Sequence, residues 1–485
     1  MAVSGGALQK IAMDNLVLKQ TLVTFQTSQG VDLHGTLIRS SKHQVVFEVY
    51  NCPTILRLSE VLESFKVTVD DHLIYGGRAT ITSLLNSGLA LVCEVGLEDV
   101  WFNPEAQLVG VTPDQAGLEF DGFFREWQKH FLIDREYRLF VSELFSFFHD
   151  LRLWLEHVEL GVRAAPQGDG HRLQQDLAQQ AAPGALKVFQ SFVDRFEPIA
   201  ARLQPELVPA HQVYMRRQLH SLVLCAPWVY RTIVKPLGYA GDYEMVNMMV
   251  GDPLQGASLF AKVVNYCFIN QNAVVAHRNR INYLVEQLKD EALRLVNANR
   301  PFRVLSIGCG PALELQRFVA QSPLAKNASF DLLDFNEETL QYVSQALASA
   351  GHRHGHGAVA MRTIRKSVFQ LVKDGARSTQ GSAASQYDFV YCAGLFDYLT
   401  DQVCRRLISL AADWLAPGGL LSVTNVSPEN PSRYGMEHML DWNLVYRDAR
   451  QMRNLVPDHW SEPSKVFSDP TGVNLWVEMR RPGNG

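Results

Sequence analysis

One stretch of the sequence, VLSIGCGPALEL (residues 304–315), constrains the fold more than any other. An apolar run that ends in glycines and continues with helical spacing is typical of a buried strand that turns directly into a helix. Gly308 and Gly310 allow a tight turn and let the backbone approach a ligand without a Cβ in the way. The free N–H groups of a helix starting near Pro311 would point at that ligand. The stretch therefore predicts a ligand-binding turn at the edge of an α/β sheet.

The sequence after residue 299 repeats this alternation of strand and helix. SFDLLDFN, YDFVYCAGLFDYL, LLSVTNV and NLWVEMRR read as further strands, with helical patterns between them. Such an alternation predicts a parallel sheet covered by helices on both faces. We assign residues 299–485 to this Rossmann-like domain. Asp334 ends its second strand, where a carboxylate can accept both hydroxyls of a ribose.

The rest of the chain divides into two further segments, as expected for 485 residues. Residues 20–110 hold short alternating runs rich in β-branched and aromatic residues, which predict a small antiparallel barrel or sandwich. After Gly122 the apolar spacing becomes helical and continues to about Asn299. The predicted architecture is multidomain: a β-barrel domain (1–115), a helical cap domain (116–298) and the α/β domain (299–485).

The glycine turn resembles a known cofactor loop. A dinucleotide fingerprint would need a third glycine at Leu313, which this chain lacks. The pattern G-x-G-x-A, Asp334 and the later stretches YDFVYCAGL and WLAPGGLLSVTNV together resemble class I S-adenosylmethionine-dependent methyltransferases. Two residues depart from that family. Ser306 stands where an acid is usual, and Ala312 replaces the third glycine.

The resemblance implies S-adenosylmethionine as the cofactor, bound at ten positions. Asp334 would hold the ribose, Phe335 would pack on the adenine, and Cys392 with Ala393 would lie beneath the methionine part. The full implied set is Ser306, Gly308, Cys309, Gly310, Asp334, Phe335, Ser367, Val368, Cys392 and Ala393. Neither the resemblance nor the residue pattern implies a metal, and the histidines of GHRHGHG (351–357) read as a solvated loop.

A second stretch, KPLGYAGDYEMVNMM (235–249), interrupts the helical segment with Pro236, Gly238 and Gly241. In class I methyltransferases, added segments close the site above the cofactor. The turn would bring Tyr239, Asp242 and Tyr243 over the sulfonium as candidate catalytic groups, since carboxylates and phenol faces attract cations. The alternative is a plain connection between two helices.

A narrower resemblance covers residues 185–485. KPLGYAGDYEMVNMM, AHRNRINYL and SPENPSRYGMEHMLDWNLVYR are similar to the extracellular-factor 3-hydroxypalmitic acid methyl ester biosynthesis methyltransferases. This resemblance implies methyl transfer to the carboxylate of a 3-hydroxy fatty acid, which gives a methyl ester signal for quorum sensing. The candidates to bind such an acid or to act on it are Arg278, Arg280, Tyr398, Asn425, Tyr434 and Trp442. A hydroxyl or amine acceptor would instead need a base, for which Asp242 and Asp397 are candidates.

Composition limits the partners. The net charge is −5 with a pI near 6.3, so nucleic acid is not an expected partner, and no apolar run predicts stable membrane insertion. Seven cysteines without a CxxC pair, and a start without a secretory signal, predict a cytoplasmic protein. The aromatic-rich helical pattern that starts at Asp134 is typical of a core or of a dimer interface, so a homodimer is possible.

The predicted barrel resembles a PilZ-like domain, whose ligand would be a cyclic dinucleotide. No R-x-x-x-R pair precedes it, the nearest candidate being Arg39 with Lys42 or His43. TSLLNSG (82–88) stands where a D/N-x-S-x-x-G element belongs. We therefore expect a degenerate module that acts in regulation or assembly. For the whole chain two alternatives to a carboxyl methyltransferase stay open: an O- or N-methyltransferase of another metabolite, and a non-catalytic sensor that binds S-adenosylmethionine.

Overall fold

The computed structural model describes residues 21–27, 30–40, 44–50, 56, 60–69, 72–86, 90–98, 132–163, 170–353, 359–368, 370–372 and 387–483. The chain forms two compact units, Met1–Asp121 and Gly122–Gly485. The helical segment and the α/β sheet, which we had separated at residue 298, thus pack into one unit. Within the described residues, no helix is both long enough and apolar enough to cross a membrane.

The first unit contains a closed barrel, as predicted. Its strands are β1 (Thr21–Gln26), β2 (Asp32–Ser40), β3 (Gln44–Tyr50), β4 (Val61–Val69), β5 (His72–Asn86) and β6 (Ala90–Leu97). They close antiparallel in the order β1-β2-β3-β6-β5-β4. Alternate residues point inward and fill the barrel, with Phe25, Phe47 and Phe65 in mutual ring contact. The PilZ-like resemblance stays a prediction, because Lys42, His43 and the side chain of Arg39 lie outside the described residues.

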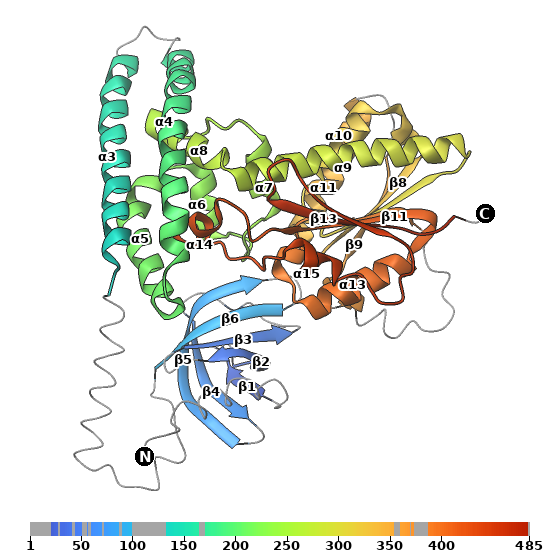
Figure 1. Cartoon of the computed structure of the whole chain (residues 1–485), viewed down its shortest axis with the longest axis horizontal. Coiled ribbons are helices and arrows are strands. Elements are labelled where there is room, and N and C mark those ends of the chain that lie inside the picture. The colour runs from blue at the N-terminus through green and yellow to red at the C-terminus, as the bar shows by residue number, and fades with distance from the viewer. Residues whose placement is uncertain are drawn as a thin grey trace, which may run out of the picture. The chain divides into compact units, whose positions relative to one another are not determined.

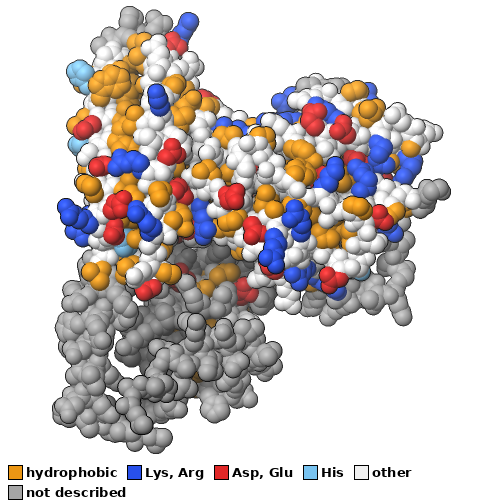
Figure 2. Space-filling model, in the orientation of Figure 1, with side chains coloured by type: hydrophobic (Ala, Val, Ile, Leu, Met, Phe, Trp, Pro, Cys, Tyr) orange, Lys and Arg blue, Asp and Glu red, His pale blue; other side chains and the backbone are white. Residues whose placement is uncertain are grey.

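The second unit begins with a helical part. It comprises α3 (Arg135–Arg163), α4 (Gly170–Ala201), η3 (Pro205–Leu207), α5 (Val208–Val223), α6 (Pro227–Val234), α7 (Tyr243–Val250) and α8 (Leu259–Ile269). The long helices α3 and α4 lie side by side as a hairpin (Figure 1). Orange hydrophobic side chains gather along this hairpin in Figure 2, and Leu139, Leu153, Trp154 and Leu160 are each more than half exposed. The homodimer stays a prediction.

A seven-stranded sheet forms the other part of this unit. Its strands are β7 (Phe302–Ile307), β8 (Ala328–Asp334), β9 (Ala360–Arg365), β10 (Tyr387–Cys392), β11 (Leu415–Val426), β12 (Ser464–Ser468) and β13 (Asn474–Arg480). The order is β12-β13-β11-β10-β7-β8-β9. The prediction of a wholly parallel sheet was wrong for β13, which runs antiparallel to both of its neighbours. The connection from β12 to β13, residues 469–473, is too short for the crossover that parallel strands require.

Helices cover both faces of the sheet (Figure 1). On one face lie α9 (Asn272–Asn297), α10 (Leu313–Gln321) and α11 (Glu337–Arg353), whose apolar sides share one core with the strands. On the other lie α13 (Asp401–Asp413) and α15 (Ala449–Arg453). Beyond β11 the chain crosses to the helical part, where α14 (Arg433–Met439) packs against α4 and α5. This crossing joins the helical part to the carboxyl ends of the central strands.

Candidate functional site

The glycine turn joins β7 to α10 as predicted. Gly308 and Gly310 have φ values of 66° and 51°, and Ala312 has φ 47°. The left-handed region costs a residue with a Cβ roughly 1–2 kcal/mol, so Ala312 is strained where the related family has glycine. The N–H groups of Gly308 and Cys309 both donate to the Leu333 carbonyl, at 2.8 and 3.0 Å. The turn is thereby fixed against the end of β8.

Asp334 lies at that end, directly beside the turn. Its carboxylate accepts hydrogen bonds from the backbone N–H groups of Gly310 (3.2 Å) and Asn336 (3.0 Å). Burial raises the pKa of Asp334, while the N–H groups oppose that shift. These two bonds aim the carboxylate at the space over the glycine turn. Cys309 and Cys392 are buried beneath this region, and Ala393 is partly exposed there.

The predicted adenine-binding residues lie next to Asp334. The N–H of Lys366 donates to the Asp334 carbonyl at 3.2 Å, which brings the end of β9 alongside. Ser367 and Val368 follow at once; Ser367 caps a turn by bonding Gln370, and Val368 is buried. Phe335 is partly exposed, so its ring is accessible to a ligand.

The turn 235–242 meets this site through only one of its three predicted side chains. The ring of Tyr239 lies 5.3 Å from that of Phe335, and burial raises the pKa of the Tyr239 phenol far above its usual value, with Asp334 adding to the shift. Tyr239 thus lies beside Phe335, the predicted adenine-packing residue, as an uncharged phenol.

Asp242 and Tyr243 serve other purposes. Asp242 is the N-cap of α7: its carboxylate accepts the Met245 N–H at 2.8 Å and forms an ion pair of 2.9 Å with Arg231. Both carboxylate oxygens face these partners, which give Asp242 a structural role; its placement over the sulfonium stays a prediction. The Tyr243 hydroxyl donates to Glu338 on α11 at 2.8 Å, and its ring stacks beside Tyr342. Local capping and surface packing explain both residues.

Tyr398 connects three segments at the carboxyl end of β10. It lies in the 3-10 turn η5 (Phe396–Tyr398). Its hydroxyl accepts from Trp442 Nε1 at 2.9 Å and donates to the Ala240 carbonyl at 3.2 Å. A Cβ on Gly241 would lie 3.2 Å from the same hydroxyl, so the backbone of the turn needs this close approach. Tyr398 and Trp442, both predicted site residues, therefore hold the turn over the sheet.

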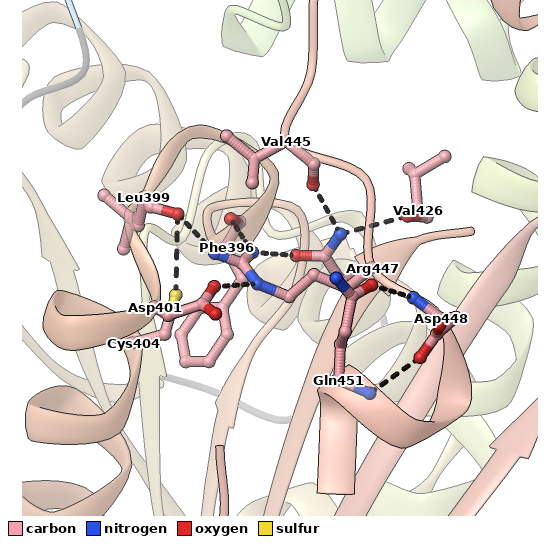
Figure 3. Close-up of polar contacts among 10 residues, drawn as sticks. Phe396, Leu399, Asp401, Cys404, Val426, Val445, Arg447, Asp448 and Gln451 are labelled. Atoms are coloured by element: carbon pink, nitrogen blue, oxygen red, sulfur yellow. Dashed lines mark hydrogen bonds and ion pairs between the residues drawn. The ribbon is translucent and has the colours of Figure 1, made fainter. Parts of the chain in front are cut away.

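Beneath Tyr398 lies Arg447, which sequence analysis missed. It is fully buried, and its guanidinium donates to the carbonyls of Phe396 (2.8 Å) and Leu399 (2.5 Å), to Asn425 Oδ1 (2.6 Å) and to Asp401 (2.8 Å) (Figure 3). The Asn425 amide donates to the Val426 and Val445 carbonyls. The side chain of Asn425 is thus engaged by partners within the protein, and its contact with substrate stays a prediction. Arg447 and Asn425 position the η5 turn.

Arg280 lies at the centre of the site. A Cβ on Gly394, just after β10, would come within 2.9 Å of its guanidinium nitrogens. Its Nη2 lies 2.7 Å from His277 Nδ1. Burial lowers the pKa of Arg280, and burial together with the nearby guanidinium groups lowers the pKa of His277 well below its usual value. His277 is therefore neutral and accepts this hydrogen bond, which orients the guanidinium.

Two other predicted substrate residues lie elsewhere. Arg278 donates to the carbonyls of Met249 (2.8 Å) and Ile269 (2.5 Å), which ties the ends of α7 and α8 to α9. The backbone N–H of Tyr434 donates to Glu197 on α4, and its ring packs in the helical core. These local partners give both residues structural roles, and their contact with substrate stays a prediction.

The sheet order, the glycine turn and the buried acid at the end of β8 define a nucleotide-binding α/β domain. Residues 276–461 match the family model described as a methyltransferase domain. This match makes residues 276–461 similar to a methyltransferase domain, the class for which S-adenosylmethionine is the predicted cofactor. The carboxylate of Asp334, the two glycines of the turn and the accessible ring of Phe335 fit that cofactor.

Solved structures with a similar arrangement are distant in sequence. A possible exported protein from Bordetella parapertussis is 18% identical, covering 66% of this chain and all of that one, with a TM-score of 0.41. Magnesium protoporphyrin IX methyltransferase from Synechocystis is 15% identical over 52% and 98% (TM-score 0.34). The N-methyltransferase NodS from Bradyrhizobium japonicum is 16% identical over 50% and 98% (0.29). No curated protein matches the sequence.

Proposed function

We propose that the protein transfers a methyl group from S-adenosylmethionine to the carboxylate of a small acid, and that this acid is a 3-hydroxy fatty acid. The observation that supports a carboxylate is Arg280. Its guanidinium is buried at the carboxyl end of β10, and no ion pair joins it to a carboxylate in the part of the chain that the structure describes. The carboxyls of Asp397 and Glu314 are near enough to act on the charge of Arg280, but a buried cation without a direct ion pair is still costly, so an anionic ligand in contact with it would stabilise it further.

The chemistry requires positioning more than proton transfer. When bound, S-adenosylmethionine supplies an electrophilic methyl group on its sulfonium. A carboxylate is already ionised at neutral pH and needs no base. Arg280, oriented by His277, would hold the acceptor in line with the methyl group, while Tyr239 and the pair of Tyr398 and Trp442 would exclude water.

A hydroxyl or amine acceptor is the second candidate, and Asp397 favours it. This carboxyl is buried, and desolvation raises its pKa to about 6, in the range of a general base that works near neutral pH. One of its oxygens accepts the Val426 N–H at 2.7 Å. An O- or N-methyltransferase would use Asp397 to remove the acceptor proton.

Labelled cofactor distinguishes these acceptors. The protein would be incubated with S-adenosylmethionine labelled in its methyl group and with a small-molecule extract of its own cells, and the products treated with mild base. Volatile methanol is expected, because base hydrolyses a methyl ester. Label in a base-stable product would instead identify an ether or amine and favour Asp397 as the base. Cofactor binding without any transfer would favour a sensor.

Arg280 itself requires a second test, because the cofactor also carries a carboxylate. In the Arg280→Met variant, we expect a raised KM for the acid acceptor and an unchanged Kd for S-adenosylmethionine. Arg280→Lys, which retains the charge, should recover part of the activity. If Arg280→Met weakens binding of S-adenosylmethionine but not of 5′-methylthioadenosine, Arg280 binds the methionine carboxylate and no longer supports an acid acceptor.

A further inference from the structure

Ser306 takes the position at which class I methyltransferases usually carry an acid. A different acid, Glu314, lies near it, with Tyr391 between the two. Ser306 on β7 is buried and is the register partner of Tyr391 on the neighbouring strand β10, with its hydroxyl close enough to act on the pKa of the Tyr391 phenol. The Tyr391 hydroxyl donates to Glu314 Oε1 at 2.7 Å. Three side chains from adjacent elements thus lie in one row that ends on a carboxyl group.

Glu314 lies in the first turn of α10, directly after the glycine turn, and is only 7% exposed. Burial raises its pKa, whereas its bonds to Tyr391 and to its own backbone N–H, and the nearby charge of Arg280, lower it. The Glu314 carboxyl also contributes to raising the pKa of Cys309 in the glycine turn, so these two side chains lie close together. An acid and a guanidinium therefore lie close enough to act on one another, without forming a direct ion pair among the described residues.

The buried carboxyl of Glu314 suits a ligand that carries an ammonium, whichever anion Arg280 binds. The α-amino group of an amino acid presents such an ammonium, with three donors. Charge-assisted hydrogen bonds to such groups are about twice as strong as neutral ones. We propose that Glu314 binds the ammonium of the methionine part of S-adenosylmethionine, in place of the acid that is absent at Ser306. The proposal rests on the cofactor assignment and is independent of the acceptor.

The test compares two ligands by calorimetry. S-adenosylmethionine carries the ammonium, whereas 5′-methylthioadenosine shares the adenosine and the sulfur but lacks the amino acid part. In the Glu314→Gln variant, the Kd of S-adenosylmethionine should rise about 10- to 100-fold, and that of 5′-methylthioadenosine should stay the same. Equal losses for both ligands, or no loss for either, would overturn the proposal. If the wild-type protein bound neither ligand, the cofactor assignment itself would fail.

A rescue variant sharpens the result. The double variant Ser306→Asp/Glu314→Gln places a carboxylate at position 306, on the other side of Tyr391 from Glu314. Part of the affinity for S-adenosylmethionine should then return. A purely structural role for Glu314 predicts no such ligand-selective recovery. If Glu314→Gln does not fold, Glu314→Asp provides the same comparison, since it keeps the charge but withdraws it by one methylene, and the loss should again be confined to S-adenosylmethionine.

Discussion

Lys235 and Asp441 both adopt the left-handed backbone conformation, with φ values of 48° and 51°, and their side chains form an ion pair of 3.0 Å. Lys235 Nζ also donates to the Asp441 carbonyl at 2.9 Å. Lys235 precedes the turn that carries Tyr239, and Asp441 precedes Trp442. The ion pair therefore links the turn that carries Tyr239 to the segment that carries Trp442. In each segment the paired residue is the one at which the backbone changes direction.

Replacing Asp441 by Asn should reduce stability without affecting the cofactor. Asn tolerates the left-handed region, so only the ion pairs of Asp441 with Lys235 and Arg216 are lost. Because these groups are partly exposed, we expect a loss of about 1 kcal/mol in the free energy of unfolding, measured in urea. Asp413→Asn on the exposed side of α13 is the matched control. A changed Kd for S-adenosylmethionine would contradict this separation.

Asp334→Ala should weaken binding of S-adenosylmethionine by roughly 1.5–3 kcal/mol if its carboxylate bonds the ribose. Calorimetry would measure this change. The melting temperature should be recorded in parallel, because Asp334 also holds the Gly310 N–H. A dissociation constant equal to that of the wild type would remove Asp334 from the cofactor site.

Asp242→Ala is expected to act on folding and not on turnover. It removes the N-cap of α7, worth about 1 kcal/mol, and leaves Arg231 without its buried partner. Chemical denaturation should show the loss, while kcat per folded molecule stays near that of the wild type. Tyr239→Phe is the contrasting variant, since it removes a hydroxyl beside the site and should lower kcat. Lost turnover in a stable Asp242→Ala protein would restore the catalytic role that the sequence had indicated.

His438 predicts a dependence of stability on pH. Burial lowers its pKa from 6.5 to about 3, and its Nδ1 lies 2.8 Å from the Tyr137 hydroxyl. The folded state therefore holds His438 neutral, so its contribution is fully present above pH 6.5 and is lost as the pH falls towards 3. Between pH 6.5 and 5 we expect a loss of about 2 kcal/mol in the free energy of unfolding. A His438→Gln protein should not show this part of the loss; an identical pH profile would exclude His438 as its source.

Local sequence patterns predicted the parts of the site that depend on neighbours in the chain. The glycine turn and Asp334 follow from a strand that ends and a helix that begins, so their positions were readable. The N-cap role of Asp242 was readable too, because Asp before a short helical run is a capping signal. Arg278 and Arg280 could not both face the site, because residues two apart on a helix point in different directions.

Long-range contacts explain what the sequence did not reveal. Arg447 bonds the carbonyls of Phe396 and Leu399, about 50 positions earlier in the chain, and no periodic pattern marks such a pairing. His277 matters because it lies one helical turn before Arg280 and both are buried by segments that come later. The antiparallel β13 likewise depends on which edge of β11 was free to pair.

The hydrogen bonds of Arg447 have a consequence for anyone who would redesign the acceptor specificity. The segment 396–399, which carries Tyr398, is held firmly. Each nitrogen of the Arg447 guanidinium donates to an oxygen of this segment or of a neighbouring residue. The turn 235–242 that covers the site is attached to it through the Tyr398 phenol, the Trp442 indole and the ion pair of Lys235 with Asp441. Libraries that vary residues 239 and 240, while keeping Gly238, Gly241 and residues 396–399 constant, would therefore explore new acceptors without dismantling the scaffold.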